Sequence, residues 1–372
     1  MPQIIFVIIV FILVADFVLE RFLSYLNIQN SKKTLPAELS DIYDNEKYLQ
    51  QQDYFRTNSK FGMISGSFSF LITLSMYLFG GFGWLDAFLG NYIDNPILLS
   101  LAFFGVIFWI SDLLGIPFEL YDTFVIEQKF GFNKVTPKIF ILDKLKSWLM
   151  SALLGAGLLS LIMWIYSLTP DYFWLLGWSV VTVFGLFMGL FYSELIVPMF
   201  NKQTPLEEGE LRTAIEKFAG KAGFKLKNIF VIDGSKRSTK ANAYFTGFGP
   251  KKRIVLYDTL MDKLSTDEIV SVLAHEIGHN KHKHTIKNML LSFATTLVLF
   301  YLLGIFLQSD PLAQALGGTK ANFHLNVLAF GILYSPISLI LDLFTNLLSR
   351  KYEYQADTYT ANHGLGNELI SG

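Results

Sequence analysis

The segment VSVLAHEIGHNKHKH, residues 270–284, contains the residues best suited to chemistry. His275 and His279 are four residues apart, so they share one face of a helix and can bind one ion. Catalytic zinc takes two or three nitrogen ligands, one carboxylate and an open position for water. Glu276 would take the proton of that water as it attacks a peptide carbonyl, and pass it to the leaving amine.

The same five-residue motif also occurs by chance, in helices whose histidines simply face solvent. Here the preceding turns are apolar, which places the histidines where the helix enters a core. The apolar residues are Ile269, Val270, Val272, Leu273 and Ala274. His282 and His284 follow in a helix end rich in lysine. That pattern is more typical of a solvated cap or a headgroup contact than of ligands.

The third ligand is expected to be a distant carboxylate. Residues 280–285 lack the glycine and the last histidine of the extended motif His-Glu-x-x-His-x-x-Gly-x-x-His. Glu353 and Asp357 lie four apart after the last apolar segment, so Glu353 could bind zinc while Asp357 orients a histidine ligand. A solvated Asp357 that pairs with a lysine is the alternative. The other carboxylates considered are Asp310, Asp342 and Glu368.

The composition indicates an integral membrane protein. The chain is 52% hydrophobic and 16% charged, with a mean hydropathy of +0.41, whereas soluble domains are about a quarter charged. The net charge of −1 gives no basic excess for nucleic acid. The absence of cysteine excludes disulfides, a cysteine nucleophile and cysteine-ligated metal sites.

Seven segments come close to the length of about 20 apolar residues that a spanning helix needs. The first lacks the basic start and small-residue cleavage site of a signal peptide, so it is also expected to be a helix. The segments are Ile4–Leu19, Phe61–Phe82, Ile97–Ile116, Trp148–Tyr166, Phe173–Val197, Met289–Leu307 and His324–Leu348.

Lysine and arginine alternate between the connecting loops. Loop 20–60 has six and loop 117–147 has five, whereas 83–96 and 167–172 have none and 308–323 has one. By the positive-inside rule the N-terminus lies outside, and the basic loops lie in the cytoplasm.

Residues 198–288 form the one long polar segment. A capping box at Thr204 and Glu207, with Pro205 at the first position, predicts a helix to about residue 220. Short strands are expected at 228–233, 242–248 and 252–258, with a turn at Gly249-Pro250. A second capping box, Ser265 with Glu268, predicts the start of the helix that carries His275.

Several longer motifs resemble the integral-membrane zinc metalloproteases of the CAAX prenyl protease 1 (Ste24-like, M48) family. The motifs cover most of the chain after residue 115 in the family's order. They are GIPFELYDTFVIEQKFGFNKVTPKIFILDKLK (115–146), IVPMFNKQTPLEEGELRTAIE (196–216), KANAYFTGFGPKKRIVLYDTL (240–260), EIVSVLAHEIGHNKHKHTIKN (268–288) and LLSRKYEYQAD (347–357).

The resemblance implies an α-helical membrane protein whose seven transmembrane helices enclose a chamber, with a small α+β gluzincin-type metalloprotease domain on the cytoplasmic side. It implies one Zn²⁺ per chain. His275, His279 and Glu353 match the zinc ligands, and Glu276 matches the base. Asn242 and Ala243 match an edge strand that lines the peptide, which an exposed strand can do through main-chain hydrogen bonds.

The domain organisation follows from the spans and the motifs. We expect five transmembrane helices in 1–197, a cytoplasmic zinc metalloprotease domain in 198–288, two transmembrane helices in 289–348 and a cytoplasmic segment in 349–372 that carries the third ligand. Family members continue beyond this point with a histidine and an arginine that stabilise the oxyanion. The loss of one such donor lowers rates about 100- to 1000-fold, so we expect impaired activity with zinc binding retained.

The predicted function is hydrolysis of peptide bonds at the membrane. The partners would be membrane lipid and a peptide or protein substrate, either prenylated at its C-terminus or a membrane protein, in a bacterial inner membrane or an endoplasmic reticulum membrane. A site-2-type intramembrane protease is disfavoured because 280–284 is too polar for the bilayer interior. A catalytically impaired seven-helix scaffold or receptor with a structural metal site is the non-enzymatic alternative.

Overall fold

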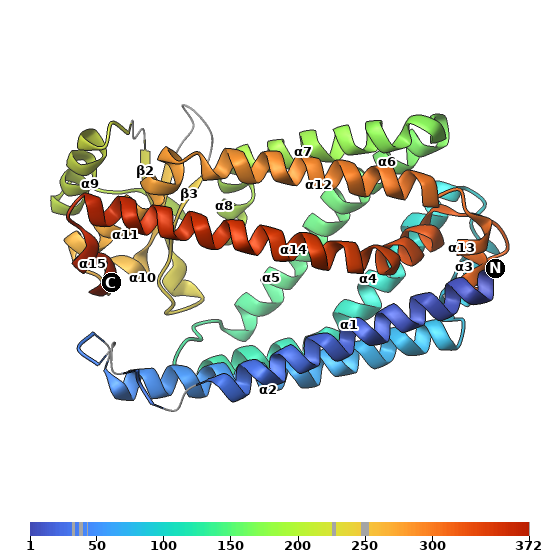
Figure 1. Ribbon diagram of the computed structural model, residues 1–372, viewed down its shortest axis with the longest axis horizontal. Coiled ribbons are helices and arrows are strands. Elements are labelled where there is room, and N and C mark those ends of the chain that lie inside the picture. Colours follow the sequence, from blue (N-terminus) through green and yellow to red (C-terminus); the bar gives the residue numbers. More distant parts are fainter. Residues whose placement is uncertain (32–33, 37–39, 43, 225–227, 247–252, 372) are drawn as a thin grey trace. The chain divides into compact units, whose positions relative to one another are not determined.

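The computed structural model describes residues 1–31, 34–36, 40–42, 44–224, 228–246 and 253–371. It is mainly helical (Figure 1) and divides into two compact units. Unit 1 comprises Met1–Phe130, Met150–Val180 and Thr296–Asp342, and unit 2 comprises Gly131–Leu149, Val181–Thr295 and Leu343–Gly372. Three of the boundaries between the units fall within the helices α7 (Phe173–Leu195), α12 (His284–Phe306) and α14 (Phe323–Asn362), so these helices contribute to both units.

Seven helical segments in the described chain are long and apolar enough to cross a membrane, which confirms the predicted number. In each, the protein buries at most 11% of the most apolar window. The remaining apolar side chains therefore need a non-aqueous phase, as in a bilayer. The segments are Pro2–Asn30 (α1), Asn45–Leu78 (α2), Pro96–Glu127 (α4, Pro96–Tyr121, with a π-helical end), Pro137–Leu168 (α5, Pro137–Met150, and α6, Gly157–Leu168), Pro170–Phe200 (α7, Phe173–Leu195, and α8, Val197–Phe200), His284–Phe306 (α12) and Phe323–Asn362 (α14).

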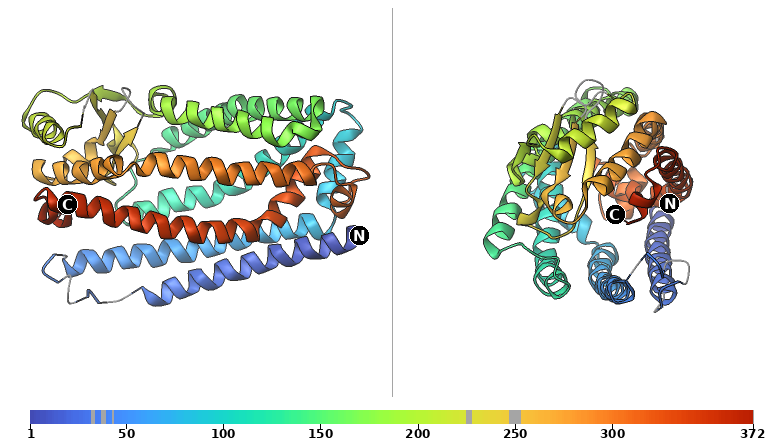
Figure 2. Two further views of the ribbon diagram at one scale, coloured as in Figure 1. Left: turned by 45° about the horizontal axis from the view of Figure 1, so that its top comes forward. Right: turned by 90° about the vertical axis from the view of Figure 1, so that its left-hand side faces the viewer.

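Unit 1 is a packed set of apolar helices. α1 and α2 run antiparallel side by side (Figures 1 and 2). The short helix α3 (Gly81–Gly90) closely approaches the turn that follows the short helix α13 (Asp310–Ala315), because a Cβ on Gly83 would lie 2.7 Å from the backbone of Gly317. At the start of α14, buried His324 lies 2.8 Å from both Asp86 and Ser100. These polar contacts join α3, α4 and α14 within an otherwise apolar core.

Unit 2 contains a four-stranded sheet of order β1-β2-β4-β3 among the described residues. β2 (Asn228–Ile232), β3 (Ala243–Thr246) and β4 (Arg253–Tyr257) fall at the three predicted strands. β2 and β4 are parallel, whereas β1 (Gln203–Pro205) and β3 are antiparallel to their neighbours. The predicted turn at Gly249-Pro250 lies outside the described residues.

The helix predicted to start near Thr204 starts later. Gln203–Pro205 forms β1 and pairs with Phe230–Ile232 of β2, so Thr204 serves the sheet rather than capping a helix. The helix that follows, α9 (Glu210–Lys221), begins after Gly209. The local capping pattern was misleading because cross-strand pairing, which depends on a distant segment, took its place.

α11 (Thr266–Lys281) carries the two motif histidines. The predicted capping box is confirmed, because Ser265 and Glu268 exchange side-chain and backbone hydrogen bonds at the first turn. One face of the helix packs into the core beside the sheet, together with β4 and α10 (Asp258–Met261). The buried apolar residues on that face are Ile269, Val270, Leu273, Ala274 and Ile277. The adjoining face carries His275, Glu276 and His279.

The C-terminal part of α14 packs against α11, followed by α15 (Gly366–Ser371) (Figure 2). The two helices approach closely at Gly278, where a Cβ would lie 3.1 Å from both Ala356 Cα and Tyr359 Cβ. Gly278 and Ala356 are both buried, and Ala356 is 0% exposed. The small residues therefore allow the two helices to approach closely beside the histidines.

Replacement of Gly278 by valine should force these helices apart. Such overpacking costs about 1–3 kcal/mol, so Gly278→Val should lower the thermal midpoint of unfolding in detergent, followed by circular dichroism. Gly220→Val in α9 is the matched control, because a Cβ there meets nothing within 4 Å. Equal losses in the two variants would show that the contact between α11 and α14 is not tight.

Candidate metal centre

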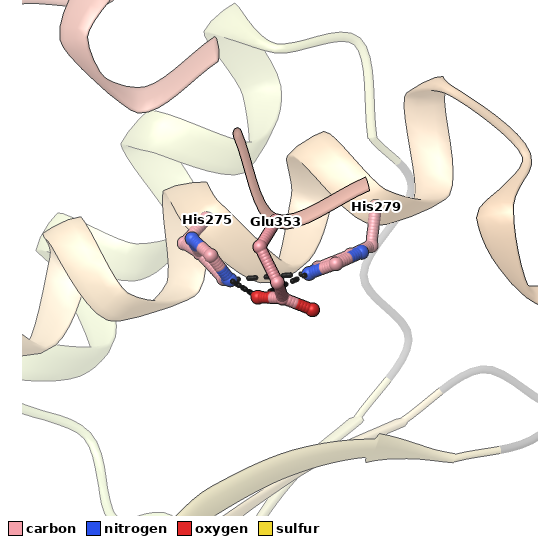
Figure 3. A group of neighbouring side chains, drawn as sticks. All are labelled: His275, His279 and Glu353. Carbon is pink, nitrogen blue, oxygen red and sulfur yellow. Dashed lines mark hydrogen bonds and ion pairs between the residues drawn. The ribbon is translucent and has the colours of Figure 1, made fainter. Parts of the chain in front are cut away.

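Three side chains from α11 and α14 converge on one point (Figure 3). The Nε2 atoms of His275 and His279 lie 3.1 Å apart. Glu353 Oε2 lies 3.3 Å from His275 Nε2 and 3.6 Å from His279 Nε2. All three residues belong to unit 2, so the cluster does not depend on the placement of the other unit.

These separations fit a tetrahedral metal site. Ligand bonds of about 2.0–2.1 Å place neighbouring ligand atoms about 3.3–3.4 Å apart in a tetrahedron. The three observed separations lie close to this value, and the donors are two imidazole nitrogens and one carboxylate oxygen. Glu353 is half-exposed at 54%, which gives the centre access to solvent. The cluster can therefore hold a metal and retain an open position.

Asp357 lies behind His275, one turn of α14 beyond Glu353. Its Oδ1 is 2.9 Å from His275 Nδ1. A carboxylate accepts hydrogen bonds, so Nδ1 of a neutral His275 carries the hydrogen and Nε2 keeps the lone pair. The structure therefore places the carboxylate where it can orient the imidazole toward a metal.

His284 lies behind His279. Its Nδ1 is 3.0 Å from His279 Nδ1, and its Nε2 is 2.8 Å from Gln355 Oε1. The expectation that His284 is a solvated cap is wrong, because the residue is only 2% exposed and stacks on Tyr352. The misleading signal was the lysine-rich sequence. The contacts that bury His284 come from α14, which is distant in sequence. His282, by contrast, is exposed.

The environment of the cluster shifts two pKa values. Burial lowers the pKa of His279, and His275 and His284 act in the same direction against Glu353. The neutral imidazole that a metal requires is thereby favoured. Burial also raises the pKa of Glu276, with Glu353 adding to the shift and His275 opposing it. A raised pKa brings this carboxyl group closer to the range in which a general base works best.

Asn242 and Ala243 lie at the start of β3, which is the last strand in the sheet order. Main-chain bonds join β3 to β4 on one side, including Tyr257 N–H to the Asn242 carbonyl. No strand pairs with the other side of β3 in the described part of the chain. Ala243 and Phe245 pack into the same core as α11. The expected open edge is therefore present on the sheet that supports the histidines.

Comparison with known proteins identifies the family. Residues 24–202 match the family model described as CAAX prenyl protease N-terminal, five membrane helices. Residues 205–368 match peptidase family M48, and this range includes the whole candidate metal centre. The chain belongs to the CAAX prenyl protease 1 family of M48 peptidases. It is a membrane metalloprotease.

Relatives of this metalloprotease match nearly its whole length. A CAAX prenyl protease 1 homolog of Oryza sativa subsp. japonica is 37% identical, over 94% of this chain and 85% of the relative. CAAX prenyl protease 1 of Saccharomyces cerevisiae is 34% identical, over 96% of this chain and 84% of the relative. The crystal structure of S. mikatae Ste24p superposes with a TM-score of 0.92 at 33% identity, covering 98% of this chain and 91% of that chain. The seven-helix fold with a small metalloprotease sheet is thereby confirmed.

The contact between Asp357 and His275 predicts a role in metal affinity. In Asp357→Asn the amide can donate to Nδ1, which favours the His275 tautomer whose Nε2 carries hydrogen. Outer partners of this kind contribute about 10- to 100-fold in affinity, so the Kd for zinc should rise by that factor. Chelator competition measures it. Asp262→Asn, at an exposed position after α10, is the control. An unchanged Kd in Asp357→Asn would contradict the assignment.

Proposed function

We propose that this metalloprotease is a zinc endopeptidase in which His275, His279 and Glu353 hold one Zn²⁺. The observation that carries the proposal is the set of three separations, 3.1, 3.3 and 3.6 Å, between the two Nε2 atoms and the carboxylate oxygen. Nitrogen and carboxylate donors in this number are typical of catalytic zinc. When bound, the ion supplies Lewis acidity, which acidifies water and polarises a peptide carbonyl.

Glu276 is the proposed general base. It follows the ligand His275 directly on α11 and is partly buried. As a carboxylate it takes the proton from the attacking water and then delivers it to the leaving amine. Asp357 holds the His275 ring by accepting from Nδ1–H. The chain thus provides separate side chains for metal binding, orientation and proton transfer.

Asn242 and Ala243 are proposed to bind the substrate main chain. An extended peptide can add to the open edge of β3 through backbone hydrogen bonds. Because β3 and α11 share a core, a peptide on this edge would be held at a fixed offset from the metal ligands. Recognition through the main chain constrains the peptide's conformation more than its sequence.

The proposed substrates are peptides with a prenylated C-terminus, together with membrane-associated proteins. The names of the relatives support the first class, since they are CAAX prenyl proteases. The seven apolar helices support both classes, because membrane lipid would surround the enzyme and present lipid-bearing chains to it. Two peptides of one sequence, with and without the prenyl group, would separate the classes through their KM values.

We further propose that the metal centre faces the cytoplasm. Basic residues are concentrated in loops 20–60 and 117–147, and Arg350 and Lys351 lie three and two residues before Glu353. Such enrichment marks the cytoplasmic side of a membrane protein. As part of this proposal we assign five transmembrane helices to 1–197 and the cytoplasmic zinc metalloprotease domain to 198–288. Two transmembrane helices then follow in 289–348, and the cytoplasmic segment with the third ligand in 349–372.

The test of the mechanism compares Glu276→Gln with His275→Ala. Glu276→Gln should retain about one zinc per chain by elemental analysis, because Glu276 is not a ligand. Loss of a general base lowers rates about 10²- to 10⁴-fold, so cleavage of a reporter peptide should fall by that factor. His275→Ala should lose both the zinc and the cleavage.

The two variants separate the claims of the proposal. Normal cleavage by Glu276→Gln would overturn its assignment as the base while leaving the zinc site intact. Full zinc content in His275→Ala would overturn the ligand set itself.

A further inference from the structure

His284 is buried beside the metal centre without contributing an atom to it. α11 ends at Lys281, Lys283 adopts the left-handed backbone conformation with φ of 58°, and α12 begins at His284. The tight reversal brings the ring back against the last turn of α11. His284 Nδ1 then lies 3.0 Å from His279 Nδ1, on the opposite side of the His279 ring from Nε2.

The contacts of His284 determine which ring nitrogens carry hydrogen. Gln355 Oε1 lies 2.8 Å from His284 Nε2, and an amide oxygen can only accept. His284 Nε2 therefore donates. A neutral His284 then has its lone pair on Nδ1, where it accepts from His279 Nδ1–H. His279 consequently keeps its lone pair on Nε2, the atom that faces Glu353.

The reverse arrangement conflicts with metal binding. If the Gln355 amide donated to His284, then His284 Nδ1–H would donate to His279 Nδ1. His279 would carry its hydrogen on Nε2, and a protonated nitrogen cannot bind a metal. The orientation with Gln355 Oε1 toward the ring is thus the one that agrees with a ligating His279.

The ring plane of His284 is also held from α14. Tyr352 stacks on it with a centroid separation of 4.1 Å and an interplanar angle of 14°. Tyr352 and Gln355 are three residues apart on one side of α14, and Glu353 and Asp357 are four apart on an adjoining side. The stack and the hydrogen bond to Gln355 together fix the direction of the Nδ1 lone pair.

We propose that His284 is a positioning residue, which holds His279 in its ligating tautomer and is itself oriented by Gln355. The inference rests on the zinc site proposed above. Under this proposal, side chains of α14 set the tautomers of both ligand imidazoles. Asp357 orients His275 directly, and Gln355 orients His279 through His284.

Two substitutions at His284 separate this role from simple packing. His284→Phe keeps a ring against Tyr352 but removes the acceptor, so the Kd for zinc should rise about 10- to 100-fold. His284→Asn removes the ring but places an amide oxygen near the former Nδ1, so most of the affinity should return. If His284 acted only through packing, His284→Phe would bind zinc more tightly than His284→Asn. Zinc Kd is measured by chelator competition on the full chain in detergent, with Asp262→Asn, at an exposed position after α10, as the unchanged control.

A second pair of variants tests the same relay at Gln355. Gln355→Glu keeps an acceptor for His284 Nε2–H and should bind zinc nearly as the wild type does. Gln355→Met has a similar volume but lacks the acceptor, so its zinc affinity should fall. This pair remains informative if a His284 variant fails to fold. Equal affinities for the two Gln355 variants would overturn the proposal.

The remaining outcomes distinguish this inference from the zinc site itself. If His275→Ala abolishes binding while His284→Phe binds as tightly as the wild type, the positioning role is wrong and the zinc site stands. If His275→Ala and Glu353→Gln leave binding unchanged, the proposed zinc site is wrong and the inference falls with it. The Co²⁺-substituted protein gives an independent readout, because a change in the His279 ligand alters its visible absorption bands.

Discussion

The close contact between α11 and α14 is the constraint on which the candidate metal centre depends. A His-Glu-x-x-His helix presents two nitrogens on one face, but a third ligand from another helix must approach within about 3.3–3.4 Å of both. Side chains on two helices at ordinary separation would need to extend and lose rotamer freedom to meet. Gly278 against Ala356 brings the backbones together, so Glu353 reaches both histidines from one turn before the contact. The packing of the two helices therefore also sets the distances between the three candidate ligands.

The hydrogen bonds behind the two proposed histidine ligands depend on the same contact between the helices. A neutral imidazole can bind a metal through Nε2 only if Nδ1 carries the hydrogen, and in water the two tautomers exchange freely. Asp357 removes this freedom from His275 at the centre's open side, where a charged acceptor remains hydrated. On the buried side His279 has the neutral His284 as its partner. A second carboxylate there would carry a desolvation cost that an imidazole avoids.

Sequence reasoning reached the features that depend on local or compositional signals. Seven apolar segments, the capping box at Ser265 and the strands beginning near 228, 242 and 252 all follow from short-range patterns. Features that depend on contacts with residues far away in the sequence could not be predicted from such patterns. Thr204 pairs with Val231 rather than capping a helix, and His284 is buried by residues of α14. Both errors arose where a polar or lysine-rich segment meets an element far away in the sequence.

The packing of α11 on the sheet also relates the candidate metal centre to the proposed peptide-binding strand β3. α11 packs through Ile269, Val270 and Leu273 into a core that also contains Ala243 and Phe245 of β3. A shift of the helix against the sheet would therefore have to disturb a dry apolar interface, which is costly in a close-packed interior. The helix that carries the motif histidines and the strand with the open edge thus pack into one core. In the proposed binding mode, this arrangement would keep the register between scissile bond and metal without requiring contacts to particular substrate side chains.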